Sequence, residues 1–162
     1  MNITPCLWFD TQAEEAARFY TSIFTDSRRT AVSRFPKVAK ERLGREPGSA
    51  MVAAFELNGQ RFTALNGGPH FQFTEAISLQ IDCETQEDVD YYWEKLSEGG
   101  DPEAQQCGWV KDKFGLSWQV VPKMLPELLM NPDSATAERA FTAMLGMKKL
   151  DIAALRRAAE GA

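Results

Sequence analysis

Two stretches of this chain match each other: LWFDTQAEEAARFYTSIF at residues 7–24 and LQIDCETQEDVDYYWEKL at residues 79–96. They align without gaps at an offset of 72 residues, and four of the eighteen positions are identical. The identical pairs are Leu7/Leu79, Asp10/Asp82, Glu15/Glu87 and Tyr20/Tyr92. Self-similarity at a fixed spacing indicates a repeated supersecondary unit. We therefore expect two copies of one module, at about residues 1–66 and 73–122.

The first copy begins with a strand and a helix. Residues 3–9 are apolar and favour β-structure, and Pro5 favours an edge strand. Thr11 and Glu14 have the spacing of a capping box, which predicts the start of a helix. The helix is supported by an apolar stripe at helical spacing, formed by Ala16, Tyr20, Ile23 and Phe24.

A run of strands follows this helix. Residues 29–35 predict one strand, and residues 49–57 and 60–65 predict a hairpin around Asn58-Gly59, a strong type I′ turn signal. Between them, residues 36–48 form a polar loop bounded by Pro and Gly. Its basic residues either clamp an anion or simply cover a solvated surface; they are Lys37, Lys40, Arg42 and Arg45.

The second copy repeats this order with fewer residues. A strand is expected at 76–82, a helix ends at Gly99-Gly100, and two further strands are expected at 107–110 and 116–121. The helix carries an apolar face made of Val89, Tyr92, Trp93 and Leu96. We predict an α+β fold of two βαβββ modules that form a curled, mixed and largely antiparallel sheet around a cleft. One strand of the second module is a candidate for loss.

Residues 123–162 differ from both copies and predict a helical extension of the 1–122 domain. Ser134 and Asp151 are candidate N-caps, and Asn131-Pro132 interrupts the chain. The apolar residues of this extension require a covering surface, either on this subunit or on a partner; they include Ala140, Met144, Met147 and Leu150.

Composition limits the classes of function. Of 162 residues, 44% are hydrophobic and 25% charged, and the formal net charge is 18 − 23 = −5, which disfavours non-specific nucleic-acid binding. No apolar run approaches the ~20 residues that cross a bilayer, and the N-terminus lacks the pattern of a secretory signal. Three widely spaced cysteines suit neither a metal knuckle nor a disulfide framework. We expect a cytoplasmic protein with reduced thiols.

The chain resembles the vicinal oxygen chelate superfamily of glyoxalases, bleomycin-resistance proteins and extradiol dioxygenases, and more closely its PhnB-like branch. That branch often carries the name "3-demethylubiquinone-9 3-methyltransferase domain". The matching stretches in the first half are PCLWFD at 5–10 and EEAARFY at 14–20. Those in the second half include LNGGP at 65–69, VDYYW at 89–93, CGWVKDKFG at 107–115 and SWQVVP at 117–122.

The resemblance implies a cavity that, where a metal is present, takes ligands from the first and last strands of both modules. The 72-residue offset and a count from the turn glycines place these positions near Thr4 or Cys6, at Thr63, near Ala76 or Ser78, and at Gln119. None is a carboxylate or an imidazole, so we expect no tightly bound metal and no other cofactor. His70, the only histidine, lies in the linker between the modules and is the best acid–base candidate.

The residues expected to line the cavity combine aromatic rings with a few polar groups, as small-molecule sites do. The candidates are Cys6, Trp8, Thr63, Asn66, Ser78, Gln80, Trp109 and Gln119. Core packing is the alternative for the two tryptophans, and a small buried thiol is the alternative for Cys6. Trp118 alternates opposite to Gln119, so we expect it beneath the helix.

Four functions follow as hypotheses. The favoured one is binding of a small apolar or aromatic molecule without metal. An alternative is a metal-dependent lyase, isomerase or dioxygenase, or an enzyme that uses His70 as base. Methyl transfer is disfavoured, because no Gly-rich turn follows the first strand. The last is an interaction module that docks through its tail. The resemblance also implies a homodimer.

Overall fold

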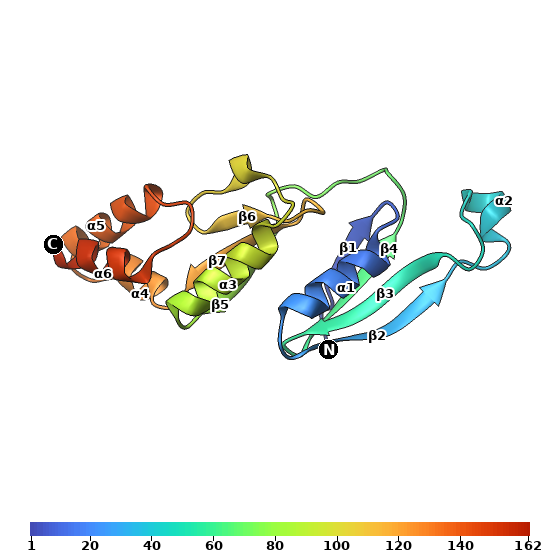
Figure 1. The fold of residues 1–162 in the computed structure, drawn as a ribbon, viewed down its shortest axis with the longest axis horizontal. Helices are drawn as coiled ribbons and strands as arrows, with labels where there is room; N and C mark the ends of the chain where they lie inside the picture. Colours follow the sequence, from blue (N-terminus) through green and yellow to red (C-terminus); the bar gives the residue numbers. More distant parts are fainter. The chain divides into compact units, whose positions relative to one another are not determined.

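The computed structural model describes all residues, 1–162, and the chain divides into two compact units, Met1–Gln72 and Phe73–Ala162 (Figure 1). The first unit holds the first sequence copy. The second unit holds the second copy together with the helical tail. No helix in the structure combines the length and the apolar character needed to cross a membrane.

The first unit is a complete βαβββ module. Its elements are β1 (Cys6–Phe9), α1 (Ala13–Ile23), β2 (Ser27–Arg34), the short helix α2 (Ala39–Leu43), β3 (Ala50–Leu57) and β4 (Gln60–Asn66). The strands form one sheet in the order β1-β4-β3-β2, in which only the β1–β4 pair is parallel. Strand β1 is therefore an edge strand, as Pro5 predicts. Asn58 and Gly59 both have positive φ, 47° and 76°, as the predicted turn requires.

Helix α1 buries its apolar stripe against one face of this sheet. Ala13, Ala16, Ala17 and Tyr20 have no exposed surface, and Tyr20 lies 6.0 Å from the ring of Phe55. Phe55 in turn stacks on Phe62 across the β3–β4 pair, with ring centroids 5.4 Å apart. Three alanines in the contact bring the helix close to the strands. The opposite face of the sheet has no helix of this unit over it (Figure 1).

The start of α1 is capped differently from the sequence prediction. The predicted capping box of Thr11 and Glu14 is wrong: the helix begins at Ala13, and no side chain of the N-cap residue Gln12 bonds to it. Instead, the buried amide of Asn66, at the end of β4, accepts a hydrogen bond from the Ala13 N–H at 2.8 Å. A residue 53 positions away thus accepts a hydrogen bond from one of the four N–H groups that have no partner within the helix at its start.

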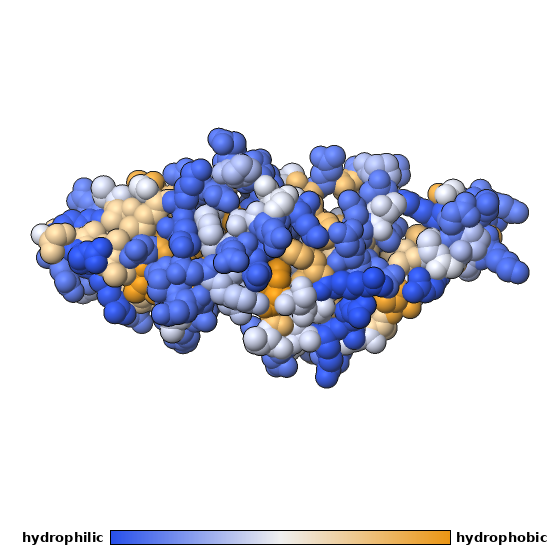
Figure 2. All heavy atoms as spheres, viewed as in Figure 1, coloured by the Kyte–Doolittle hydropathy of each residue, from blue (hydrophilic) through white to orange (hydrophobic).

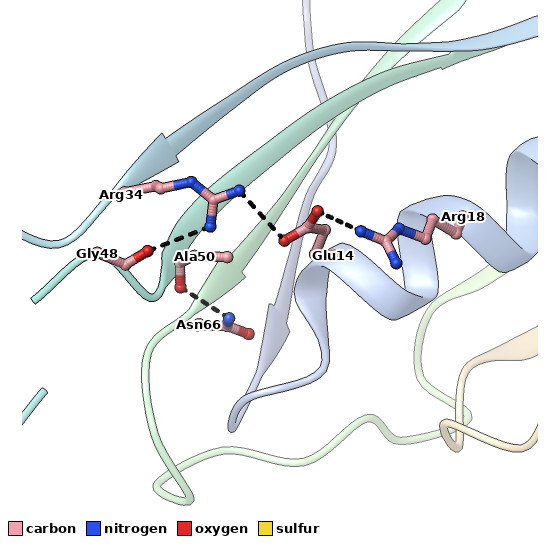
Figure 3. A network of polar contacts seen from close by, with 6 residues as sticks. All are labelled: Glu14, Arg18, Arg34, Gly48, Ala50 and Asn66. Carbon is pink, nitrogen blue, oxygen red and sulfur yellow. Dashed lines mark hydrogen bonds and ion pairs between the residues drawn. The ribbon is translucent and has the colours of Figure 1, made fainter. Parts of the chain in front are cut away.

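The amide nitrogen of Asn66 forms a hydrogen bond to a second element, strand β3. The Asn66 Nδ2 donates to the Ala50 carbonyl oxygen at 2.9 Å, so one side chain joins α1, β3 and β4 (Figure 3). Glu14 takes no part in capping. It forms ion pairs with Arg18 at 2.6 Å and with Arg34 of β2 at 3.8 Å. The Arg34 Nη1 also donates to the Gly48 carbonyl oxygen at 3.2 Å.

Asn66→Ala should lower the free energy of unfolding by about 1–3 kcal/mol, because it removes the side-chain partner of the buried Ala13 N–H and of the partly buried Ala50 carbonyl. Urea unfolding monitored by circular dichroism measures this change. Gln12→Ala is the matched control, since Gln12 occupies the N-cap position without a side-chain bond there and should change stability by less than ~0.5 kcal/mol. Equal stability of the Asn66 variant and the parent would contradict the capping assignment.

The second unit repeats the module with one strand fewer. Its elements are β5 (Ser78–Cys83), α3 (Gln86–Ser97), the 3₁₀ turn η1 (Pro102–Ala104), β6 (Trp109–Lys111) and β7 (Ser117–Pro122). The strand order is β5-β7-β6, with β5 and β7 parallel and β6 antiparallel to β7. No strand lies between α3 and β6, so the shorter copy has lost its second strand. Here a capping box does form, between Thr85 and Asp88.

Within the second unit, the helical tail packs on the second module. It consists of α4 (Leu125–Leu129), α5 (Ser134–Leu145) and α6 (Ile152–Glu160). A buried cluster joins Val121 of β7 to Leu125, Leu150 and Leu155. Gln86 of α3 adds two hydrogen bonds, donating to the Leu150 carbonyl oxygen at 3.2 Å and accepting from the Ile152 N–H at 2.8 Å.

The predicted caps of the tail are half correct. Asp151 caps α6 as predicted, with its Oδ1 2.7 Å from the Ala154 nitrogen. At α5 the cap is Asp133 rather than Ser134, which is the first helical residue; a carboxylate there accepts from two N–H groups. Phe141 and Leu145 of α5 stay about half exposed, and Figure 2 shows apolar surface over this helical end of the unit.

Candidate functional site

The uncovered face of the first sheet is the first part of the candidate site. Strand pairing places its side chains in three rows. Two of them cross β1, β4 and β3, and the third crosses β4, β3 and β2. The apolar row contains Trp8, Leu65 and Val52; the small row contains Cys6, Thr63 and Ala54; the charged row contains Arg61, Glu56 and Arg28. Directly paired residues share one face of a sheet, so each row is a line of neighbours. Three of the predicted site residues, Cys6, Trp8 and Thr63, are therefore brought together here.

Trp8 is held by the turn that follows β4. Its indole Nε1 donates to the Gly68 carbonyl oxygen at 2.8 Å, and its ring meets the edge of Phe71 at 4.9 Å. Gly67 lies directly under the indole, since a Cβ at that position would come within 2.1 Å of the ring. The Gly67-Gly68 pair therefore fixes the orientation of Trp8, which remains partly exposed.

Gly67→Ala should displace the Trp8 indole, because no Cβ fits beneath it. The expected result is a large shift or loss of the Trp8 Nε1–H signal in an NMR spectrum of the full chain. Gly146→Ala is the matched control, since a Cβ there meets only an ordinary contact at 3.5 Å. An unchanged Trp8 signal in the Gly67 variant would refute this packing.

One face of the second sheet gathers the other predicted residues. Gln119 of β7 lies between Gln80 of β5 and Trp109 of β6, its direct partners in the two strand pairs. The Gln119 Nε2 donates to the Ser78 Oγ at 2.8 Å. Trp109 is partly exposed beside them. The structure thus places Ser78, Gln80, Trp109 and Gln119 in one patch.

A lysine borders this patch. Lys111 pairs with Ser117 across the β6–β7 strands and forms an ion pair with Glu75 in the turn before β5. The hydrogen bond from Lys111 holds the pKa of the Glu75 carboxyl below its ordinary value. This face therefore combines two amides, a hydroxyl and an indole with a lysine whose charge is balanced by Glu75.

The buried carboxylate of Asp112 stabilises the hairpin that carries this patch. Asp112 is 2% exposed, and its Oδ1 accepts from the N–H groups of Phe114 and Leu116, while its Oδ2 accepts from the Trp118 Nε1 at 2.9 Å. Trp118 is itself 2% exposed, on the face opposite to Gln119 as predicted. Asp112 thus shapes the β6–β7 hairpin that presents Trp109 and Gln119.

The remaining predicted residues fall outside these two patches. Asn66 is buried, and both ends of its amide bond to the backbone, as described above. His70 lies exposed in the loop after β4, near the end of the first unit. Cys6 is exposed rather than a small buried thiol, because β1 turns it to the uncovered face.

Burial raises the pKa of the Cys83 thiol to about 12, and the charges of Asp88 and Asp82 add to this effect. The reactive thiolate is therefore nearly absent from Cys83 at pH 8. Iodoacetamide at that pH should alkylate the exposed Cys6 while Cys83 stays unmodified, as peptide mass spectrometry would show. Alkylation of Cys83 in the folded protein at the rate of Cys6 would contradict its burial.

The donor groups of the two faces do not fit a metal ion. The first and last strands of the units present Cys6, Trp8, Thr63 and Leu65 on one sheet and Ser78, Gln80, Ser117 and Gln119 on the other. This set holds one thiol and no carboxylate or imidazole, whereas a catalytic metal needs about three such ligands. No group of three or more His, Cys, Asp or Glu side chains in the chain is suitably placed for a metal.

The strand register also corrects the positions inferred from the turn glycines. Gln119 pairs with Gln80, and Trp8, the equivalent of Gln80 at the 72-residue offset, pairs with Leu65. Leu65, not Thr63, is thus the counterpart of Gln119. Thr4 and Ala76 lie outside β1 and β5.

One candidate residue was not identified from the sequence. Glu56 is the only carboxylate in the strands of the first sheet, and its side chain is 16% exposed. Arg28 Nη2 lies 2.7 Å from its Oε2, and Arg61 Nε lies 3.5 Å from its Oε1. The signal was available: a two-residue turn at Asn58-Gly59 pairs Glu56 directly with Arg61.

Comparisons with known proteins agree with this fold. A model of the 3-demethylubiquinone-9 3-methyltransferase family matches residues 1–121. The solved PhnB protein of Bacillus cereus is 36% identical, with a TM-score of 0.63, over 75% of this chain and 99% of that one. A search of curated proteins gives no match.

More distant structures share the fold alone. The fosfomycin resistance protein FosX of Listeria monocytogenes is 16% identical, with a TM-score of 0.51, over 81% of this chain and 98% of that one. Protein PA1353 of Pseudomonas aeruginosa is 19% identical, with a TM-score of 0.57, over 76% of this chain and 98% of that one. The matched family region, the duplicated module and the PhnB likeness lead to one conclusion: this chain belongs to the 3-demethylubiquinone-9 3-methyltransferase (PhnB-like) family, within the vicinal oxygen chelate superfamily.

Proposed function

We propose that this protein binds a small apolar or aromatic molecule on the uncovered faces of its sheets, without a tightly bound metal. The observation that carries the proposal is the pair of partly exposed tryptophans, Trp8 and Trp109, each set beside small polar side chains. An indole that is partly exposed and fixed in orientation offers a large apolar surface at little entropic cost. Thr63, Ser78, Gln80 and Gln119 supply the few polar groups that orient a ligand.

The donor set argues against a metal-dependent reaction as the function. A lyase, isomerase or dioxygenase of this superfamily would need a cation, and the strands offer it amides, hydroxyls and a single thiol. Methyl transfer, which the family name mentions, has no Gly-rich turn to hold a nucleotide-like cofactor, since Asp10-Thr11-Gln12 follows β1. We therefore propose binding rather than either chemistry.

We also propose that the protein is a cytoplasmic homodimer. The sheet of the first unit has one face without a helix of its own unit, and partly exposed apolar residues such as Leu65 and Val52 lie on this face. Burying such a face against a second copy would remove apolar surface from water. The three unpaired cysteines are in keeping with a reducing compartment. Light scattering at micromolar concentration tests the dimer, and a strict monomer would refute it.

An NMR titration with 4-phenylbutan-1-ol tests the binding proposal. The indole N–H signals of Trp8 and Trp109 should shift with a saturable dependence on the alcohol. The signal of Trp118 should not, because that indole is buried and bonded to Asp112, so it serves as an internal control. Native mass spectrometry of the freshly purified protein should show a retained organic molecule and no stoichiometric metal. Stoichiometric metal, or equal shifts of all the indoles, would overturn the proposal.

A further inference from the structure

The charged row has a structure that the binding of an apolar molecule does not explain. Two arginines from different strands, Arg28 of β2 and Arg61 of β4, converge on Glu56 of the intervening strand β3. The Glu56 side chain is 16% exposed, while the side chains of Arg28 and Arg61 are 73% and 69% exposed. Glu56 thus positions two exposed cationic groups on one side of a sheet.

The arginines keep donors that Glu56 does not use. The Glu56 contacts involve Nη2 of Arg28 and Nε of Arg61, and each guanidinium carries five N–H donors. One carboxylate between two guanidinium groups leaves a local charge of 2 − 1 = +1. The chain as a whole carries −5, so this row is a local reversal of its charge.

A surface depression lies over this row. It has a volume of about 450 Å³, and its polar lining consists of Thr4, Thr30 and Thr63 together with Arg28, Glu56 and Arg61. Three hydroxyls and two planar guanidinium groups are the donors that recognise oxyanions. The depression is large enough for a carboxylate or phosphate group with part of the molecule that carries it.

The other rows of the same face provide a place for the remainder of such a molecule. The small row, with Cys6, Thr63 and Ala54, separates the charged row from the apolar row of Trp8. Two residues along a strand span about 6.6 Å, so the charged and apolar rows lie roughly 13 Å apart. Small side chains between them leave space above the sheet.

We infer that the Arg28–Glu56–Arg61 row binds the anionic group of a small molecule, a carboxylate or a phosphate, whose apolar part extends toward Trp8. Arg28 and Arg61 contact the oxyanion, and Glu56 is a positioning residue that holds both guanidinium groups. This inference rests on the proposed function and adds to it the charge of the ligand.

The head group is tested first, with inorganic phosphate and with acetate at constant ionic strength. In NMR spectra of the full chain, the Nε–H signals of Arg28 and Arg61 should shift with saturation. Arg28→Gln and Arg61→Gln should each weaken binding at least about tenfold, the loss expected for a charge-assisted hydrogen bond. Comparison of the two anions shows whether the site prefers a planar or a tetrahedral group.

Arg29→Gln is the matched control. Arg29 is the neighbour of Arg28 on β2 and pairs with Phe55, so it lies on the opposite face of the sheet while carrying the same charge. Binding that weakens equally in the Arg29 and Arg28 variants would show only general attraction to cations and would overturn the inference. Circular dichroism and thermal unfolding of each variant confirm that the fold is retained.

A matched pair of amphiphiles then separates the two proposals. 4-Phenylbutanoate should bind at least about tenfold more tightly than 4-phenylbutan-1-ol, and only the Arg28 and Arg61 variants should lose this advantage. Equal affinity for the acid and the alcohol would overturn the inference and leave the binding of apolar molecules intact. If phosphate saturates the arginine signals and neither amphiphile binds, the anion site stands alone and the proposed function fails.

Discussion

The pairing of the first strand of each unit with its last strand is the constraint on which the rest of the structure depends. Strand β1 lies parallel to β4, and β5 lies parallel to β7, so a helix must cross between the two strands of each pair. In the first unit, that helix covers one face of the sheet and leaves the other without a helix of the unit. The register of the same pairs decides which side chains share the uncovered face. The same strand pairing therefore determines which residues form the core and which form the candidate site.

The two units meet the same requirement at the start of their helices by different means. Helix α3 uses a local capping box, Thr85 with Asp88. Helix α1 uses the distant Asn66, whose amide also holds the start of β3. The local solution leaves its strands independent of the cap, whereas the distant solution ties cap, hairpin and sheet into one hydrogen-bonded unit. This difference explains why Asn66, at first a candidate for ligand binding, is a structural residue.

Several features follow from local sequence. The apolar stripes of α1 and α3, the Asn58-Gly59 turn and the orientation of Trp118 depend on neighbours within a few positions, and the repeat is found by comparing the sequence with itself. The loss of a strand in the second copy is visible in the sequence, because the second copy is shorter than the first. The predicted capping box at Thr11 was wrong for a specific reason: a pattern of two residues shows only that a bond can form, and in the structure the distant Asn66 bonds to the start of the helix instead.

The sequence by itself therefore determined the family, the duplicated α+β module and the residues that alternate toward an uncovered face. Only the tertiary structure decided the equivalence of Leu65 with Gln119, the exposure of Cys6 and the addition of Arg28 to the Glu56–Arg61 pair. The physical reason is range. Helical and strand periodicity act over a few residues, whereas pairing between β2, β3 and β4 joins residues up to tens of positions apart, through hydrogen bonds whose register no local pattern states.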